Sequence, residues 1–307
     1  TGIGMKGKSR HKIQVTLAPD TGSTPLNVLN TALHAALNVD VLSGKTLIVV
    51  DGPVSTNDTV NNDGTIGGDV EAVNGVNNNG DISGTITAPV PIKEMPLPWV
   101  FDMYRDMATQ LPYSGDFDKD VLAPGYNSYG GGLNADGVYF IDTGGDDIRI
   151  KGSLIHGTLV VKCGSSRVVR LDDAVFMHSF RSDYPVLIVD GHLEVSLKSD
   201  LYELEESTWS TNFNPGGAPY MGSSDSDEAD TYPNEVRGLV YVQGELWLKQ
   251  ASLMRGAVIC ADRVQCEGDN LIILDPVLFL NPPLGFTAVD PNAPMEVVAG
   301  TWKQAVD

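Results

Sequence analysis

One ten-residue stretch is written twice, and this repeat constrains the fold more than any other feature of the chain. NNDGTIGGDV at 61–70 returns as NNNGDISGTI at 77–86, sixteen residues later. The matching positions are Asn61, Asn62, Gly64, Ile66 and Gly68 with Asn77, Asn78, Gly80, Ile82 and Gly84. A short unit repeated at a fixed spacing predicts a solenoid, because the unit buries its inward side chains only when the next copy stacks on it.

Short apolar runs continue through the rest of the chain. They are β-branched, bounded by Gly, Asp or Asn, and typical of strands. They lie at 46–50, 138–141, 148–150, 158–161, 167–171, 185–189, 192–197, 239–242, 245–248, 256–260 and 270–274. The pattern Val189-x-Gly191-x-Leu193-x-Val195 recurs as Val242-x-Gly244-x-Leu246-x-Leu248. We therefore predict an all-β, right-handed parallel β-helix, or β-solenoid. A β-sandwich, which also has many short strands, is the alternative.

Helical periodicity is clear in one place, LPWVFDMYRDMATQL at 97–111. Val100, Tyr104, Met107 and Leu111 share one helical face, and Pro98 suits a first turn. We expect this short helix to cap an open end of the solenoid, since unpaired strand edges favour aggregation. Residues 26–37 are a second, weaker helix candidate that a strand would also explain.

Proline and loop composition divide the chain into three predicted parts. Residues 1–95 form a strand-rich N-terminal segment with short coils, and 288–307 form a C-terminal tail with a final strand anchored by Trp302. Residues 96–287 form the main solenoid, interrupted by a long loop at 201–236. The proline-rich stretch 88–98 reads as an extended connector between the first two parts.

The charge balance excludes some partners. Forty acidic residues against 20 basic ones give a net charge of −20, which repels nucleic acid and anionic lipid. No apolar run reaches the roughly 20 residues that span a membrane. The chain starts at Thr1 and carries a basic cluster at 6–12. A position just outside a removed apolar N-terminal membrane helix would explain this cluster, and a disordered start of the chain explains it equally well.

Candidates for catalysis are few. The acidic pairs at 146–147 and 172–173, with Arg149 and Arg170, would suit the Asp- and Arg-lined face of a carbohydrate-active β-helix. Paired Asp residues at turns more often bond their own backbone, which is the reading we favour. Loop aromatics that would suit a sugar are Tyr126, Tyr129, Trp209 and Tyr220.

The best metal candidate is the acidic stretch SSDSDEAD at 223–230. Asp225, Asp227, Glu228 and Asp230 give the carboxylate density that Ca²⁺ prefers. The stretch lacks the glycine and distal Glu of a helix–loop–helix calcium loop, and a solvated acidic loop is the favoured alternative. No other cofactor is expected.

The remaining motif search points away from enzymes. Five histidines show no metal-ligand spacing, and no nucleophile elbow, phosphate loop or dinucleotide fingerprint is present. Three cysteines are too few for a disulfide scaffold, leaving either buried thiols or one bridge between Cys260 and Cys266.

Several stretches together resemble a known family. DGTIGGDVEAV and GDISGTITA look like stacked coils of bactofilin-type solenoids. MPLPWVFDMY, FNPGGAPYMGSSDSDEADTYP and GLVYVQGEL resemble bacterial type IV pilin-like surface proteins, whose solenoid is exported on an apolar N-terminal helix. The resemblance implies an extracellular or cell-surface protein with no catalytic residues to transfer.

These observations predict an exported, non-catalytic structural protein of a bacterial cell surface, pilus-like filament or surface lattice. Its partners would be further copies of itself, without nucleic acid. The alternative is a carbohydrate-binding or carbohydrate-degrading β-helix protein. An intracellular polymerising scaffold of bactofilin type is a third, less favoured reading.

Overall fold

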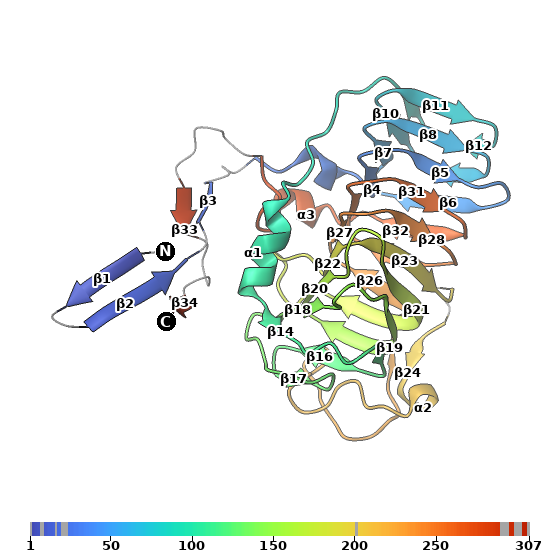
Figure 1. Cartoon of the computed structure of the whole chain (residues 1–307). Coiled ribbons are helices and arrows are strands. Elements are labelled where there is room, and N and C mark those ends of the chain that lie inside the picture. The colour runs from blue at the N-terminus through green and yellow to red at the C-terminus, as the bar shows by residue number, and fades with distance from the viewer. Residues whose placement is uncertain are drawn as a thin grey trace.

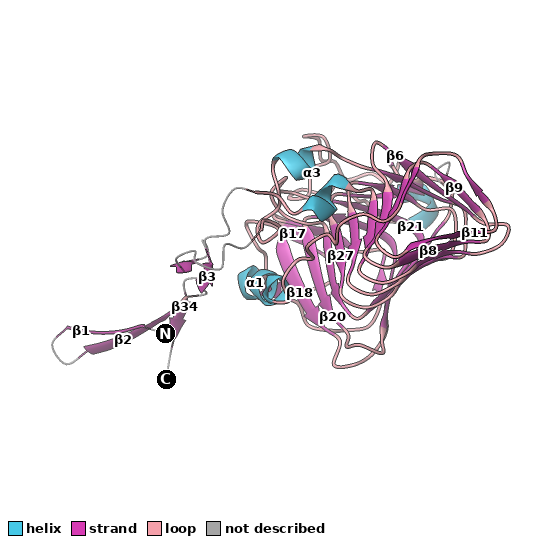
Figure 2. Cartoon of the chain, turned by 90° about the horizontal axis from the view of Figure 1, so that it is seen from above, coloured by secondary structure: helices cyan, strands magenta, loops and turns pink. Residues whose placement is uncertain are grey.

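The chain winds into a three-sided solenoid of parallel strands, seen from the side in Figure 1 and from above in Figure 2. This computed structural model describes residues 2–6, 9–15, 17–19, 24–199, 202–288, 295–297 and 303–305. The prediction of an all-β parallel solenoid is confirmed. The β-sandwich is excluded because stacked strands of successive coils pair in parallel.

The first side of the solenoid is a ten-stranded parallel sheet. In spatial order its strands are β13 (Ile86–Thr87), β10 (Val70–Ala72), β7 (Val54–Thr56), β4 (Leu33–Ala35), β30 (Val258–Cys260), β27 (Val240–Val242), β22 (Leu187–Asp190), β20 (Thr158–Lys162), β18 (Val138–Asp142) and β14 (Thr109–Gln110).

The other two sides belong to one 17-stranded sheet. The second side contains β11 (Gly75–Asn78), β8 (Thr59–Asn62), β5 (Val39–Val41), β31 (Val264–Cys266), β28 (Leu246–Leu248), β23 (His192–Leu197), the first parts of β21 (Val168–His178) and β19 (Ile148–His156), and β15 (Phe117–Asp118). The third side contains β12 (Asp81–Ile82), β9 (Thr65–Gly67), β6 (Thr46–Val50), β32 (Asn270–Ile273), β29 (Leu253–Arg255), β26 (Glu235–Arg237), the second parts of β21 and β19, β16 (Val121–Ala123) and β17 (Tyr126–Asn127).

The coils do not stack in sequence order. β4 pairs with β7 on one side and with β30, from the far end of the chain, on the other. The chain therefore starts in the middle of the stack, winds to one end at β13, crosses to the opposite end at β14, and winds back to the middle. The predicted segments 1–95 and 96–287 consequently share one hydrophobic core.

The repeat that opened the sequence analysis is one coil stacked on the next. Ile66 lies opposite Ile82, and Asn61 lies opposite Asn77, in parallel register. Asn77 donates from Nδ2 to Asn61 Oδ1 at 2.8 Å, and Asn61 donates to Asp40 Oδ1 at 2.6 Å. The sixteen-residue spacing is thus the length of one coil, and Asn61 and Asn77 form a hydrogen-bonded ladder on its outside.

The repeated glycines at the corners serve close packing. A Cβ on Gly80 would lie 1.9 Å from the carbonyl oxygen of Gly64, and a Cβ on Gly64 would lie 2.3 Å from that of Lys45. Neither glycine has a positive φ, whereas Gly68 and Gly75 do. A left-handed backbone is the usual reason for a glycine at a sharp corner. At Gly64 and Gly80 the approach of stacked backbones is the reason instead.

The predicted helix is present as α1 (Trp99–Met107), but its position differs from the expectation. It packs against β18 and β20 on the outer face of the ten-stranded sheet, not across an end of the solenoid. Phe101 meets Phe140 edge to face, and Tyr104 meets Tyr184 in the same way. Some of the side chains that β18 and β20 point outward are apolar. On this side of the solenoid, α1 covers them. The weaker candidate 26–37 forms the 3-10 turn η1 (Asn27–Asn30) followed by β4.

The long loop at 201–236 covers the third side near the β14 end. It contains β24 (Leu204–Glu205), α2 (Glu206–Trp209) and β25 (Thr231–Tyr232). A second cluster of buried residues lies beneath it, including Phe176 of the solenoid and Phe213 of the loop. The loop is therefore a packed layer with its own core.

The terminal segments pair with each other outside the solenoid body (Figure 1). β1 (Gly2–Lys6), β2 (Ser9–Gln14) and β34 (Lys303–Ala305) form one small sheet, and β3 (Leu17–Pro19) pairs with β33 (Met295–Val297). The tail thus contains strands, while Trp302 lies outside the described residues. None of the helices in the described ranges has the length and hydropathy of a membrane span.

Candidate functional site

The charged residues proposed for catalysis lie together on the second side, where they pair across coils. Arg149 reaches Asp116 at 3.4 Å and Asp172 at 3.7 Å, and Arg170 reaches Asp147 at 3.3 Å. Exposed pairs of this kind contribute about 0–1 kcal/mol each. These pairs matter more for chemistry than for stability. Each carboxylate faces a guanidinium, and it has no unpaired carboxylate beside it with which to share a proton.

The ladder of ion pairs continues along the same side and its corners. Further cross-coil pairs are Lys151–Asp118, Arg170–Glu194, Lys198–Asp173, Arg263–Glu245 and Lys249–Glu267. Asp146 is not part of this ladder. Its backbone N–H donates a hydrogen bond to Thr143 Oγ1 within a turn. This side of the solenoid therefore carries the residue types of a catalytic face, but its charges are arranged in pairs that link neighbouring coils.

The loop aromatics proposed for sugar binding pack into the protein. Tyr129 stacks on Phe117 with ring centroids 3.9 Å apart and donates its hydroxyl to the Gly115 carbonyl at 2.8 Å. Tyr126, Trp209 and Tyr220 pack against the second core. All four rings are half-buried in these contacts, and the carbohydrate-binding alternative stays a prediction.

The structure brings together two of the four acidic residues proposed for Ca²⁺. Asn214 Nδ2 lies 2.8 Å from Asp230 Oδ2 and 3.4 Å from Asp225 Oδ2. Asp227 instead accepts the backbone N–H of Ala229 within its own turn. Across the described ranges, no three His, Cys, Asp or Glu side chains form a group that could hold a metal. A calcium site involving Glu228 as well stays a prediction.

The acidic side chain that organises this loop is Glu206, which the sequence analysis missed. It is completely buried, and its carboxylate accepts the backbone N–H of Phe213 at 2.6 Å, that of Asp230 at 3.0 Å and the Tyr232 hydroxyl at 3.0 Å. Burial and the adjacent carboxylate raise the pKa of Tyr232 above its usual range. The only sequence signal was a Glu beside Trp209 in a polar loop, which does not distinguish a buried residue from an exposed one.

The cysteines are inert by position. Cys163, Cys260 and Cys266 are free and buried, so the predicted alternative of a Cys260–Cys266 bridge is wrong. Burial raises the pKa of Cys163 and Cys260 to about 12 and that of Cys266 to about 11. A thiolate is the reactive form, so none of the three is a candidate nucleophile.

The histidines behave similarly. His156 and His178 stack with ring centroids 4.0 Å apart, and His34 lies fully buried beside Ser55. Burial lowers the pKa of both His34 and His178 to about 3. These rings are neutral packing elements near neutral pH, as the sequence analysis favoured.

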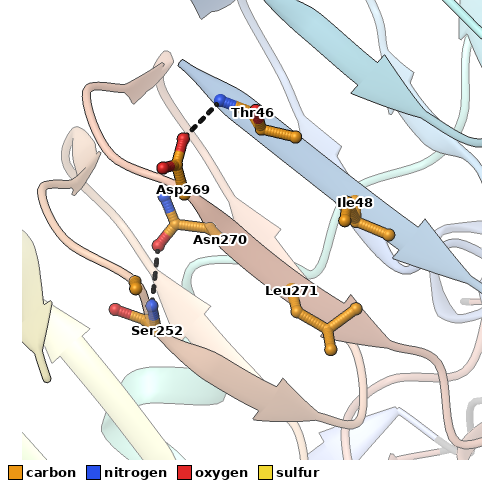
Figure 3. A pocket seen from close by; sticks show the side chains of 7 residues that line it. Thr46, Ile48, Ser252, Asp269, Asn270 and Leu271 are labelled. Atoms are coloured by element: carbon orange, nitrogen blue, oxygen red, sulfur yellow. Dashed lines mark hydrogen bonds between the residues drawn. The ribbon is translucent and has the colours of Figure 1, made fainter. Parts of the chain in front are cut away.

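An apolar row with one well-exposed residue lies on the third side. Gly67, Ile48, Leu271 and Leu253 lie in register on four neighbouring strands, with Ile48 42% exposed. We call these four positions the apolar row. Beside the row lies a shallow hollow of about 250 Å³, shown in Figure 3 with Ile48 and Leu271 on adjacent strands.

The polar edge of the hollow is already hydrogen-bonded. Asp269 accepts the backbone N–H of Thr46 at 3.0 Å, and Asn270 accepts that of Ser252 at 3.3 Å (Figure 3). The hollow offers one carboxylate and no histidine, cysteine or cation among its lining residues. It is suited to contact with an apolar surface and not to acid–base chemistry.

Comparisons with known proteins return distant structural likenesses. No family model and no curated protein matches the chain. A solved DUF3494 domain of an ice-binding protein from Shewanella frigidimarina is 11% identical, with a TM-score of 0.36, covering 85% of this chain and 99% of that one. An ice-binding protein from the Antarctic ascomycete Antarctomyces psychrotrophicus is 12% identical, with a TM-score of 0.30, covering 82% and 99%. Neither protein is described as a pilin or a bactofilin, and likenesses this low assign no family.

Proposed function

We propose that this protein is an exported, non-catalytic structural element of a bacterial cell surface, which acts through the outside of a rigid solenoid. The observation that carries the proposal is the cross-coil ladder of ion pairs. The residues best suited to catalysis, Arg149 and Arg170, each bridge carboxylates of neighbouring coils. Such a surface holds the coils in register and leaves no acid or base poised for a substrate.

The hydrophobic core supports the same proposal. Inward residues of three sides form one continuous cluster along the whole stack. Each coil contacts mainly its neighbours, so the stability of the solenoid grows as coils are added. A protein with these properties is suited to present surfaces at a distance from a membrane, in a filament or lattice of the kind the sequence predicts.

Two measurements test the proposal. The purified chain is incubated with acidic and neutral polysaccharides, with and without Ca²⁺, and new reducing ends are counted. We expect no product above that of a heat-denatured sample. Protease shaving of intact source cells, followed by detection with an antibody, should remove the protein. Turnover that is lost in Arg170→Ala, or protection of the protein inside intact cells, would refute the respective part.

A second candidate function is adsorption to an ordered surface such as ice. The apolar row, and not the distant structural likeness, is the observation that favours it. Parallel strands lie about 4.8 Å apart, so outward side chains of β9, β6 and β32 form straight rows on a regular face. Thr46 and Thr65 form a second row beside Ile48.

Ice-growth assays separate this candidate from the first. Adsorption predicts slowed recrystallisation with the wild-type chain and its loss in Ile48→Glu, which places a charge in the row. Ile92→Glu is the matched control, because Ile92 is 72% exposed on the connector, away from the third side. Equal behaviour of both variants and the wild type excludes the apolar row as an ice-binding face.

A further inference from the structure

The solenoid ends differently at its two ends. At the β14 end, the inward residues Leu111, Phe117 and Leu122 are at most 1% exposed. Tyr129 stacks over Phe117, and β17 pairs antiparallel along β16. This end is closed by the chain itself.

The opposite end exposes its core. The last coil, residues 74–87, carries three inward residues, Val76, Ile82 and Ile86, opposite fully buried residues of the coil beneath. Val76 and Ile82 are only half-buried, and Ile86 is 46% exposed. The three strands β11, β12 and β13 pair on one edge each, and no described strand pairs with the other edge. We call this surface the open end.

The connector does not cover the open end. It leaves the last coil after β13 and runs back along the first side, where Val90 donates its backbone N–H to Ala72 at 3.1 Å. Lys93 then pairs with Glu71 at 2.9 Å, again one coil below the end. Apolar residues and unpaired strand edges therefore coincide at one small surface, which is the type of surface that another β-structure completes.

The last coil carries fewer charged residues than the coil beneath it. The coil beneath carries four acidic residues, Asp58, Asp63, Asp69 and Glu71. The equivalent positions sixteen residues later are neutral, namely Asn74, Asn79, Thr85 and Thr87. Asp81 is the single charged residue of the last coil, in a chain with a net charge of −20.

The neutral residues are also able to bond to copies of themselves. Asn74 and Asn79 each donate one Nδ2 hydrogen to a carboxylate beneath, Asp58 at 2.7 Å and Asp63 at 2.9 Å. An amide group has a second N–H and a carbonyl oxygen, so each side chain retains a donor and an acceptor. Stacked asparagine ladders are a recurrent way to join β-structures across chains.

We propose that the open end is a self-association surface at which two copies of this chain meet end to end about a two-fold axis. The same apolar triangle and the same amide-rich edges face each other, as an isologous interface requires. The edge strands would pair antiparallel across the contact. Because the other end is closed, stacking through this surface gives a closed dimer and not a filament. The inference stands whether or not the protein is catalytic.

The test is sedimentation velocity of the full chain over a wide concentration range. The wild type should shift from monomer to dimer as concentration rises. Asn74→Lys/Asn79→Lys should weaken the dimer at least tenfold, because lysines on an edge obstruct pairing and repel their copies. Each new ammonium faces a carboxylate beneath, so the coil itself is retained. Ser224→Lys/Ser226→Lys adds the same charge on the exposed 223–230 loop and should dimerise like the wild type.

Hydrogen exchange locates the contact independently. Amides of residues 75–87 should become more protected with concentration in the wild type and not in the Asn74→Lys/Asn79→Lys variant. A wild type that stays monomeric overturns the proposal and leaves the open end to a different protein. Growth beyond a dimer that the Asn74→Lys/Asn79→Lys variant abolishes, equal weakening by the Ser224/Ser226 control, or protection confined to another region also overturns it.

Discussion

Shortening Ile66 to alanine tests the stacked-coil core at its most constrained point. Ile66 is completely buried between Leu47 and Ile82 in adjacent coils. Ile66→Ala removes three carbon atoms, worth about 2.4 kcal/mol at about 0.8 kcal/mol for each buried carbon group. The cavity left in a stack that cannot collapse raises the total to about 3–4 kcal/mol.

The same substitution one coil further provides the comparison. Ile82 occupies the equivalent position but is half-buried at the open end, so Ile82→Ala should cost less than about 1.5 kcal/mol. Ile48→Ala, at a 42% exposed outward position, should cost less than about 1 kcal/mol.

Urea unfolding followed by circular dichroism and by tryptophan fluorescence measures these differences. The urea midpoint should decrease most in Ile66→Ala, less in Ile82→Ala and least in Ile48→Ala. The two signals should give the same order. The measurement is made below the concentration at which the wild type associates, so that the open end is solvated. Equal losses at Ile66 and Ile82, or a loss below about 1 kcal/mol at Ile66, would refute the stacked-coil account of the core.

Four other predictions follow from contacts described above. Gly64→Ala should lower the melting temperature by several degrees, since its Cβ would overlap two carbonyl oxygens, and a normal melt would show that the coils separate easily. Glu206→Gln should make the loop at 201–236 cleavable by protease while the solenoid stays intact, and unchanged cleavage would argue against Glu206 as its anchor. With a folded pKa of about 3 against an ordinary 6.5, His34 takes up a proton first in the unfolded chain, so it should lower stability by up to about 1.4 kcal/mol per pH unit as pH drops from about 6.5 towards 3. His178 has the same lowered pKa, so His34→Gln should reduce the slope of stability against pH and leave the part due to His178. Thiol reagents at pH 8 should label none of the three cysteines until the chain unfolds, and rapid labelling of the native protein would contradict their burial.

The sequence predicts local features of this fold better than its long-range order. The pairing of Ile66 with Ile82 follows from the sixteen-residue repeat, because stacked copies must align like residues. The pairing of Leu33 with Val258 has no such signal, since both are ordinary inward residues of short strands. The helix at 99–107 was evident from its periodicity, but periodicity does not tell which surface its apolar face covers.

The same limit applies to the candidate sites. The sequence identified Asp147 and Arg170 as residues of the types found in catalytic sites. Only the stacking of the coils shows that the two side chains form an ion pair. The acidic stretch 223–230 was evident from composition, whereas the buried Glu206 that holds it was not. Burial of a polar group depends on partners supplied from distant parts of the chain, which composition does not encode.

The out-of-order stacking also determines when this protein becomes a folded one. Residues 33–50 pair early with 54–67, but they acquire their second neighbour only when 258–273 arrive, as in the hydrogen bond between Thr46 and Asp269, which are 223 residues apart in the sequence. A chain that emerges from a ribosome or a membrane pore N-terminus first must hold its first coils with one face unpaired until almost all of it has passed. Closing so large a loop is slow, and the chain is exposed to wrong pairing while it waits. The coils that emerge last are therefore the ones that complete the stack. Truncation near residue 258 should destabilise the N-terminal coils that pair with this segment as well as the C-terminal coils.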